Sequence, residues 1–188
     1  MSALVLLFIG ALWTCGPAAK SPARTPAAAG QAVDLEALYA SGIGFGDFLQ
    51  TADRRADAWS DHYANGRVDA EMVRRASSVR GDWKLLAIAE DWCSDSVNTI
   101  PYLALLAERV DGLELRIIDA DAGRALMEAH PTPDGRAATP TVLILDEGYR
   151  RVGCWVERPE PLQAWALEAR PTLGDRAFLE RKMAWYAE

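Results

Sequence analysis

The order of hydrophobic and polar positions along the chain predicts an α/β protein. Four short runs have the length and composition of strands, at residues 83–89, 113–119, 141–145 and 149–155, and the apolar stretch 85–89 in the first is predicted to be buried. Apolar residues recur at helical spacing between and after these runs, over residues 94–110, 121–130, 161–169 and 175–186. Strand, helix and strand, followed by a hairpin and a helix, predict a mixed central sheet flanked by helices on both faces. We expect the first three strands to run parallel or nearly so, and the fourth antiparallel.

Helical patterns also precede the first strand. They cover Val33–Ala40, Phe45–Tyr63 and a third stretch that begins at the N-cap residue Asp69 and ends near Val79. Trp59 belongs to the second pattern and is predicted to be a core residue. We interpret residues 33–81 as a helical extension in front of a domain that spans residues 82–188.

The first residues of the chain form a separate segment. The apolar run Ala3–Trp13 is shorter than the roughly 20 residues of a membrane-spanning helix and fits the core of a signal peptide. The residues that end at Cys15 loosely resemble a bacterial lipobox, whose cysteine becomes lipidated. We predict a signal peptide or lipoprotein leader at residues 1–19 and a disordered Ala/Pro-rich tether at residues 20–32. The expected location is the periplasm or the membrane surface, and ordinary cleavage or an uncleaved anchor are the alternatives to lipidation of Cys15.

Composition and charge exclude several classes of function. The net charge of −7 argues against a nucleic-acid surface, because phosphate contacts need clustered Lys and Arg. Only three cysteines and two histidines are present, and no two cysteines have CxxC spacing. We therefore expect no metal centre, no cofactor, and no membrane contact except through an N-terminal lipid anchor.

The most informative stretch is Leu85–Ser96, which reads LLAIAEDWCSDS. Cys93 follows a predicted buried strand and precedes a predicted helix, a position in which a helix N-terminus stabilises a thiolate. Glu90 and Asp95 lie close to it in sequence, and carboxylates that turned toward the sulfur would oppose that effect. The sequence therefore predicts a functional thiol at Cys93 without fixing its acidity.

Several residues around this stretch resemble the thioredoxin superfamily in order and spacing. They are the pair Trp92-Cys93, Pro101 eight positions later, Asp119 at the end of the second strand, Thr139-Pro140 before the apolar strand, and Gly153 in the last strand. The resemblance implies a thioredoxin-like fold in which Pro101 kinks the active-site helix. It also implies a cis Thr139–Pro140 bond beside Cys93, with Trp92, Thr139 and Pro140 binding the substrate.

The sequence resembles more closely a bacterial thioredoxin-like group with a helical N-terminal extension and a Trp-Cys-x-Asp-Ser or Trp-Cys-x-Asp-Cys site. Ser96 stands where ordinary thioredoxins carry the second cysteine, and Ala87 stands where they carry a buried carboxylate. The Ser96 hydroxyl either donates to a Cys93 thiolate or caps its own helix. Asp95 is expected to support the site, most simply by complementing the helix dipole.

The resemblance implies thiol–disulfide exchange through the single nucleophile Cys93, with Ser96 assisting. The partners would be proteins or small molecules that carry thiols or disulfides. A non-catalytic thioredoxin-like binding module and a structural envelope lipoprotein are the alternatives. Whether the protein is an enzyme is left open at this stage.

Overall fold

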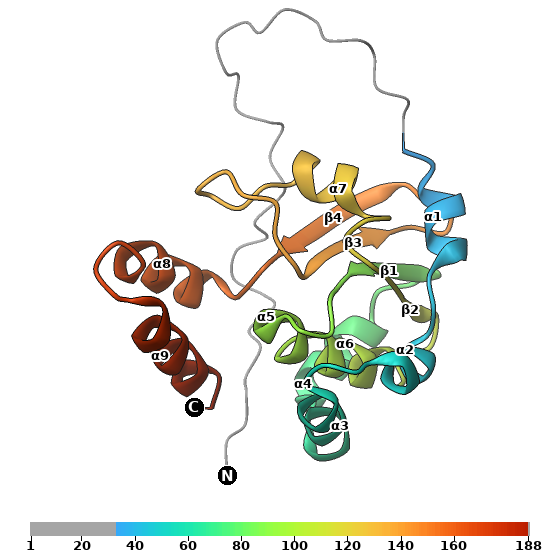
Figure 1. Cartoon of the computed structure of the whole chain (residues 1–188). Helices are drawn as coiled ribbons and strands as arrows, with labels where there is room; N and C mark the ends of the chain where they lie inside the picture. Colours follow the sequence, from blue (N-terminus) through green and yellow to red (C-terminus); the bar gives the residue numbers. More distant parts are fainter. Residues whose placement is uncertain (1–32, 188) are drawn as a thin grey trace, which may run out of the picture.

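A computed structural model describes residues 33–187 of the chain (Figure 1). The expected leader, the tether and Cys15 lie outside the described residues, so the expectations about them stay predictions. Within residues 33–187, no helix is both long and apolar enough to cross a membrane.

The centre of the fold is a four-stranded sheet with the strand order β2-β1-β3-β4. Its strands are β1 (Trp83–Ile88), β2 (Leu113–Ile118), β3 (Thr141–Leu145) and β4 (Arg151–Val156). The sequence pattern placed each of them to within two residues. In the central strand β1, Leu85 and Ala87 are buried on one face of the sheet, and Leu86 and Ile88 on the other. The predicted mixed sheet flanked by helices is confirmed.

One predicted strand direction is wrong. Strand β1 is parallel to β2, as expected, but β3 is antiparallel to β1, and β4 is antiparallel to β3. The helix before β3, α7 (Arg124–Ala129), has six residues and is only about 9 Å long, whereas a six-residue strand spans about 20 Å. The chain therefore does not return along the sheet, and β3 begins where β1 ends, with Thr141 opposite Ile88.

Helices cover both faces of the sheet (Figure 1). One face packs against α1 (Leu35–Ser41) and α7 through a cluster that includes Tyr39 and Met127. The other packs against α2 (Phe45–Thr51), α3 (Ala56–Asn65), α5 (Ser94–Val97) and α6 (Ile100–Ala107). Helix α4 (Ala70–Ser77) begins at the predicted cap, Asp69, and contributes no buried residue. Helices α8 (Glu160–Ala169) and α9 (Asp175–Ala187) lie to one side of the sheet.

Two predicted helices are interrupted. The helix expected over residues 45–63 divides at residues 52–55, where Arg55 has the left-handed φ of 56°. The helix expected over residues 94–110 divides at residues 98–99, before Pro101. Proline has no N–H to continue the helical ladder, and the Val97 carbonyl bonds instead to His62 Nδ1 across 2.8 Å. Both breaks lie beside the loop that carries Cys93.

Candidate functional site

Cys93 lies at the junction between β1 and α5. It is the N-cap residue of α5, and the backbone N–H of Ser96 donates to its sulfur across 3.4 Å. The Cys93 thiol in turn donates to the backbone carbonyl of Thr139 across 3.2 Å. The residue is only 7% exposed. The sulfur therefore lies between the first turn of α5 and the loop before β3, with little access for a reactant.

The loop before β3 carries the expected cis peptide bond, between Thr139 and Pro140. Pro140 is buried, and its carbonyl accepts the backbone N–H of Glu157 across 2.7 Å. Trp92, the neighbour of the cysteine, is 54% exposed. The structure thus places Thr139 against the sulfur of Cys93 and leaves the indole of Trp92 largely in solvent.

Ser96 is completely buried one helical turn after Cys93. Its backbone N–H, rather than its hydroxyl, contacts the sulfur. The hydroxyl has no hydrogen-bond partner within residues 33–187, neither the sulfur nor the helix backbone. A buried hydroxyl without a partner is costly. Replacing Ser96 by cysteine would therefore break no hydrogen bond of the side chain.

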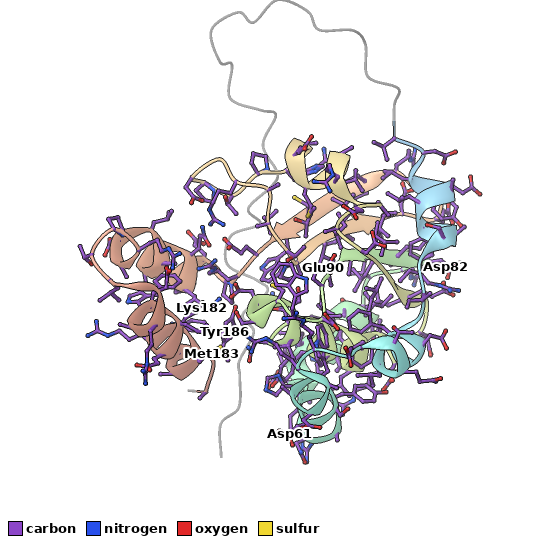
Figure 2. All side chains as sticks on the ribbon, viewed as in Figure 1. Asp61, Asp82, Glu90, Lys182, Met183 and Tyr186 are labelled. Carbon is purple, nitrogen blue, oxygen red and sulfur yellow. The ribbon has the colours of Figure 1, made fainter. Side chains whose placement is uncertain are left out.

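Asp95 forms the centre of a buried ionic cluster rather than facing solvent at the helix terminus. Its Oδ2 accepts Lys182 Nζ across 2.8 Å and lies 3.6 Å from Arg158 Nη2, and its Oδ1 accepts the Tyr186 hydroxyl across 2.9 Å. Lys182 also donates to the Ser94 hydroxyl across 2.8 Å. Figure 2 shows Lys182 and Tyr186 on α9, directed toward α5. The carboxylate beside the candidate nucleophile is therefore already paired and ties α9 to the site.

Sequence reasoning missed Lys182, Tyr186 and Arg158 as neighbours of the site. A signal was present in α9, where Phe178, Lys182 and Tyr186 follow one another at four-residue spacing and share a face. All three are buried. A lysine between two aromatic residues on a buried face requires an acidic partner, and Asp95 supplies it.

A second ion-pair group follows β4. Glu157 is buried, has the left-handed φ of 64°, and accepts Arg136 through Nη2 at 3.1 Å and Nη1 at 3.3 Å. It also pairs with Arg158. Because Arg158 lies near Asp95 and Glu157 bonds to Pro140, this group connects the cis-proline loop to the ionic cluster of α9.

The helices before the sheet hold the loop in front of Cys93. The side chain of Asp91 accepts the backbone N–H groups of Asp53 and Arg54 across 2.9 and 2.8 Å. The indole N–H of Trp59, a fully buried residue as predicted, donates to the Asp91 carbonyl across 2.9 Å. Arg55 Nε donates to the Trp92 carbonyl across 2.8 Å. The break between α2 and α3 therefore brings the donors of Asp53, Arg54 and Arg55 to the loop in front of Cys93.

A cavity of about 480 Å³ opens beside this loop, at the carboxyl ends of β1 and β2. Phe48, Ile117 and Glu90 are among the residues that line it. The Glu90 carboxylate accepts the Ala120 N–H across 2.8 Å and so closes the loop after β2. Within residues 33–187, no three His, Cys, Asp or Glu side chains lie close enough to hold a metal ion.

Tyr186 makes the stability that the ionic cluster contributes depend on pH. Burial, followed by the charge and hydrogen bond of Asp95, raises its pKa well above the ordinary tyrosine value of about 10. Because the folded-state pKa is raised, the stabilisation is complete below pH 10 and is lost as the pH rises above it. The difference in unfolding free energy between wild type and Tyr186→Phe should therefore shrink above pH 10, by up to about 1.4 kcal/mol per pH unit.

Urea unfolding of both proteins at pH 7 and pH 11 measures this effect. The other tyrosines are common to the two proteins and cancel in the difference. Parallel losses of stability in the two proteins would show that the pKa of Tyr186 is not raised, and therefore that its hydroxyl is not buried against Asp95.

A central mixed sheet, a cysteine at the end of its central strand and a cis-proline loop against the sulfur define the class of thioredoxin-like folds. In agreement, a family model described as Thioredoxin matches residues 42–172. The chain therefore belongs to the thioredoxin family. No curated protein matches it.

Two solved structures are similar to the chain. A crystallised HIV epitope scaffold is 26% identical, with a TM-score of 0.56, over 68% of this chain and 79% of its own. A protein of unknown function from Pseudomonas aeruginosa, PA1234, is 26% identical, with a TM-score of 0.54, over 79% of this chain and 87% of its own.

Proposed function

We propose that the protein is a thiol–disulfide exchange protein of single-cysteine type, with Cys93 as nucleophile. The observation that carries the proposal is the position of the Cys93 sulfur, which accepts the Ser96 N–H and lies 3.2 Å from the Thr139 carbonyl. Membership of the thioredoxin family supports a redox role. The Trp-Cys-x-Asp-Ser sequence and the helices before β1 fit the bacterial group that the sequence resembles.

The exchange proceeds in two steps. Cys93 loses its proton to solvent, and its thiolate attacks one sulfur of a substrate disulfide, so that a Cys93–substrate disulfide forms and the other substrate sulfur leaves as a thiolate. An external thiolate, such as that of glutathione, then attacks the mixed disulfide. The second attack regenerates Cys93 and leaves a disulfide between the substrate and the external thiol, so no further oxidant or reductant is required.

Three residues bear on this scheme. The Ser96 N–H stabilises negative charge on the sulfur, while the Ser96 side chain cannot form a disulfide. Thr139, before the cis-proline, offers backbone groups to an extended substrate beside the sulfur. Ala87 is fully buried in the apolar core and holds no proton, which argues against fast dithiol chemistry.

A stable mixed disulfide is the expected product of the first step. Wild-type protein incubated with oxidised glutathione should gain one glutathione on Cys93, because no second thiol at position 96 releases it. Intact mass and peptide mapping measure the adduct, and Cys93→Ser is the matched control. A wild-type protein that remains unmodified at Cys93 after long incubation would contradict the proposal.

One observation favours the binding-module alternative. Trp92, the residue before Cys93, is 54% exposed, whereas Cys93 is 7% exposed, so the surface offers an aromatic contact more readily than a thiol. In a binding module, Trp92→Ala would abolish partner capture and Cys93→Ser would leave it unchanged. An exchange protein gives the opposite dependence on Cys93.

A further inference from the structure

The last two helices form a small unit with its own apolar contacts. Trp165 of α8 stacks on Phe178 of α9 with ring centroids 5.3 Å apart, and Ala166, Ala169 and Leu173 complete the cluster. This cluster is separate from the two that hold the sheet. Figure 1 shows the two helices beside the sheet, with α9 facing α5. Helices α8 and α9 are therefore held together in large part by apolar contacts with each other.

Helix α9 contacts α5 and the residue after it through two polar side chains and one methionine. Lys182 bonds to Ser94 and Asp95, Tyr186 bonds to Asp95, and Met183 Sδ lies 4.0 Å from Asn98 Nδ2. Figure 2 shows Lys182, Met183 and Tyr186 together on the side of α9 that faces α5. These contacts lie across the short helix that begins at Cys93.

The favourable and unfavourable free energies of the contact between α9 and the site nearly cancel. Burying charges such as those of Asp95 and Lys182 costs desolvation that their attraction roughly balances. Arg158, whose Nη2 lies 3.6 Å from Asp95 Oδ2, has a buried Nε without a hydrogen-bond partner within the described residues. Movement of α9 would let water reach the Asp95 cluster and this nitrogen, which favours the open state.

We propose that α9 is a displaceable lid over Cys93, held shut by the bonds of Lys182 and Tyr186 to Asp95. This inference rests on the proposed function, because exchange requires a disulfide to reach Cys93, a residue that is only 7% exposed while α9 is docked on Ser94 and Asp95. Displacement of α9 opens the first turn of α5 and lets the disulfide approach. The resting protein is thereby protected from unselective oxidation.

The rate at which iodoacetamide alkylates Cys93 in the full-length chain tests the lid. Lys182→Met removes the charge that binds Asp95 and keeps the length of the side chain, so alkylation should become roughly tenfold faster. Arg181→Met is the matched control, since Arg181 has the same charge, is the preceding residue of α9 and is exposed. Its alkylation rate should equal that of wild type.

Tyr186→Phe provides a second, milder variant, because it removes one hydroxyl and keeps the ring. It should also accelerate alkylation, while its circular dichroism shows an intact fold. Equal alkylation rates in wild type, Lys182→Met and Tyr186→Phe would overturn the lid. Faster alkylation in both variants, without exchange activity in any of the proteins, would support the lid and refute the proposed function.

Discussion

Replacing Ser96 by cysteine should convert the protein into a dithiol reductase. The backbone of residue 96 already lies within 3.4 Å of the Cys93 sulfur, and its side chain is fully buried on the same helical turn. The Ser96 hydroxyl has no hydrogen-bond partner in the described chain, so its replacement sacrifices none. A thiol at this position attacks a Cys93 mixed disulfide within the molecule, at a high effective concentration.

The measurement is reduction of insulin disulfides with dithiothreitol as electron source. Because release of the mixed disulfide becomes intramolecular, the rate for Ser96→Cys should exceed that of wild type by about tenfold or more. The double variant Cys93→Ser/Ser96→Cys has one thiol at the wrong position and should be inactive. If the double variant were as active as Ser96→Cys, the nucleophile would not be Cys93.

Removal of the Asp95 carboxylate should cause the largest loss of stability. Asp95→Ala leaves Lys182 and Arg158, both buried, without their shared anion, and it removes the acceptor of Tyr186. Breaking a buried ion pair from one side costs up to about 3–5 kcal/mol, and movement of α9 that lets water reach Lys182 reduces this loss. Urea unfolding at neutral pH measures this loss.

Asp121→Ala is the matched control for this effect. Asp121 pairs with Arg124 on the surface, where its side chain is 87% exposed, so its loss should cost about 1 kcal/mol or less. The double variant Asp95→Leu/Lys182→Met replaces a buried pair by apolar groups and should recover part of the stability. A loss of stability for Asp95→Ala as small as that for Asp121→Ala would mean that α9 is not tied to the site by this cluster.

The sequence predicted the features that depend on local pattern. The four apolar runs, the position of Cys93 after β1, and the cis bond before Pro140 are all present in the structure. The first two depend on residue type at a fixed spacing, which a linear sequence carries directly, whereas the cis bond was implied by the resemblance to thioredoxins. The thioredoxin-like fold could therefore be inferred before any contact was known.

The features that were wrong or missed depend on contacts between distant segments. The direction of β3 follows from the shortness of α7, and a sequence pattern defines helix length poorly. The break before α3 follows from the hydrogen bonds of Asp91, 37 or more residues away. The cluster of Asp95 and Lys182 joins residues 87 positions apart, and only the buried face of α9 hinted at it.

The most direct test of the central claim is glutathione-dependent reduction of a small mixed disulfide by wild type and by Cys93→Ser. Wild type should catalyse the reaction, and Cys93→Ser should not. The unfolding free energies of the two proteins, measured in urea, should agree to within about 1 kcal/mol, because a sulfur-to-oxygen change at this one position keeps the fold. A Cys93→Ser variant that retains the wild-type rate would contradict exchange through Cys93.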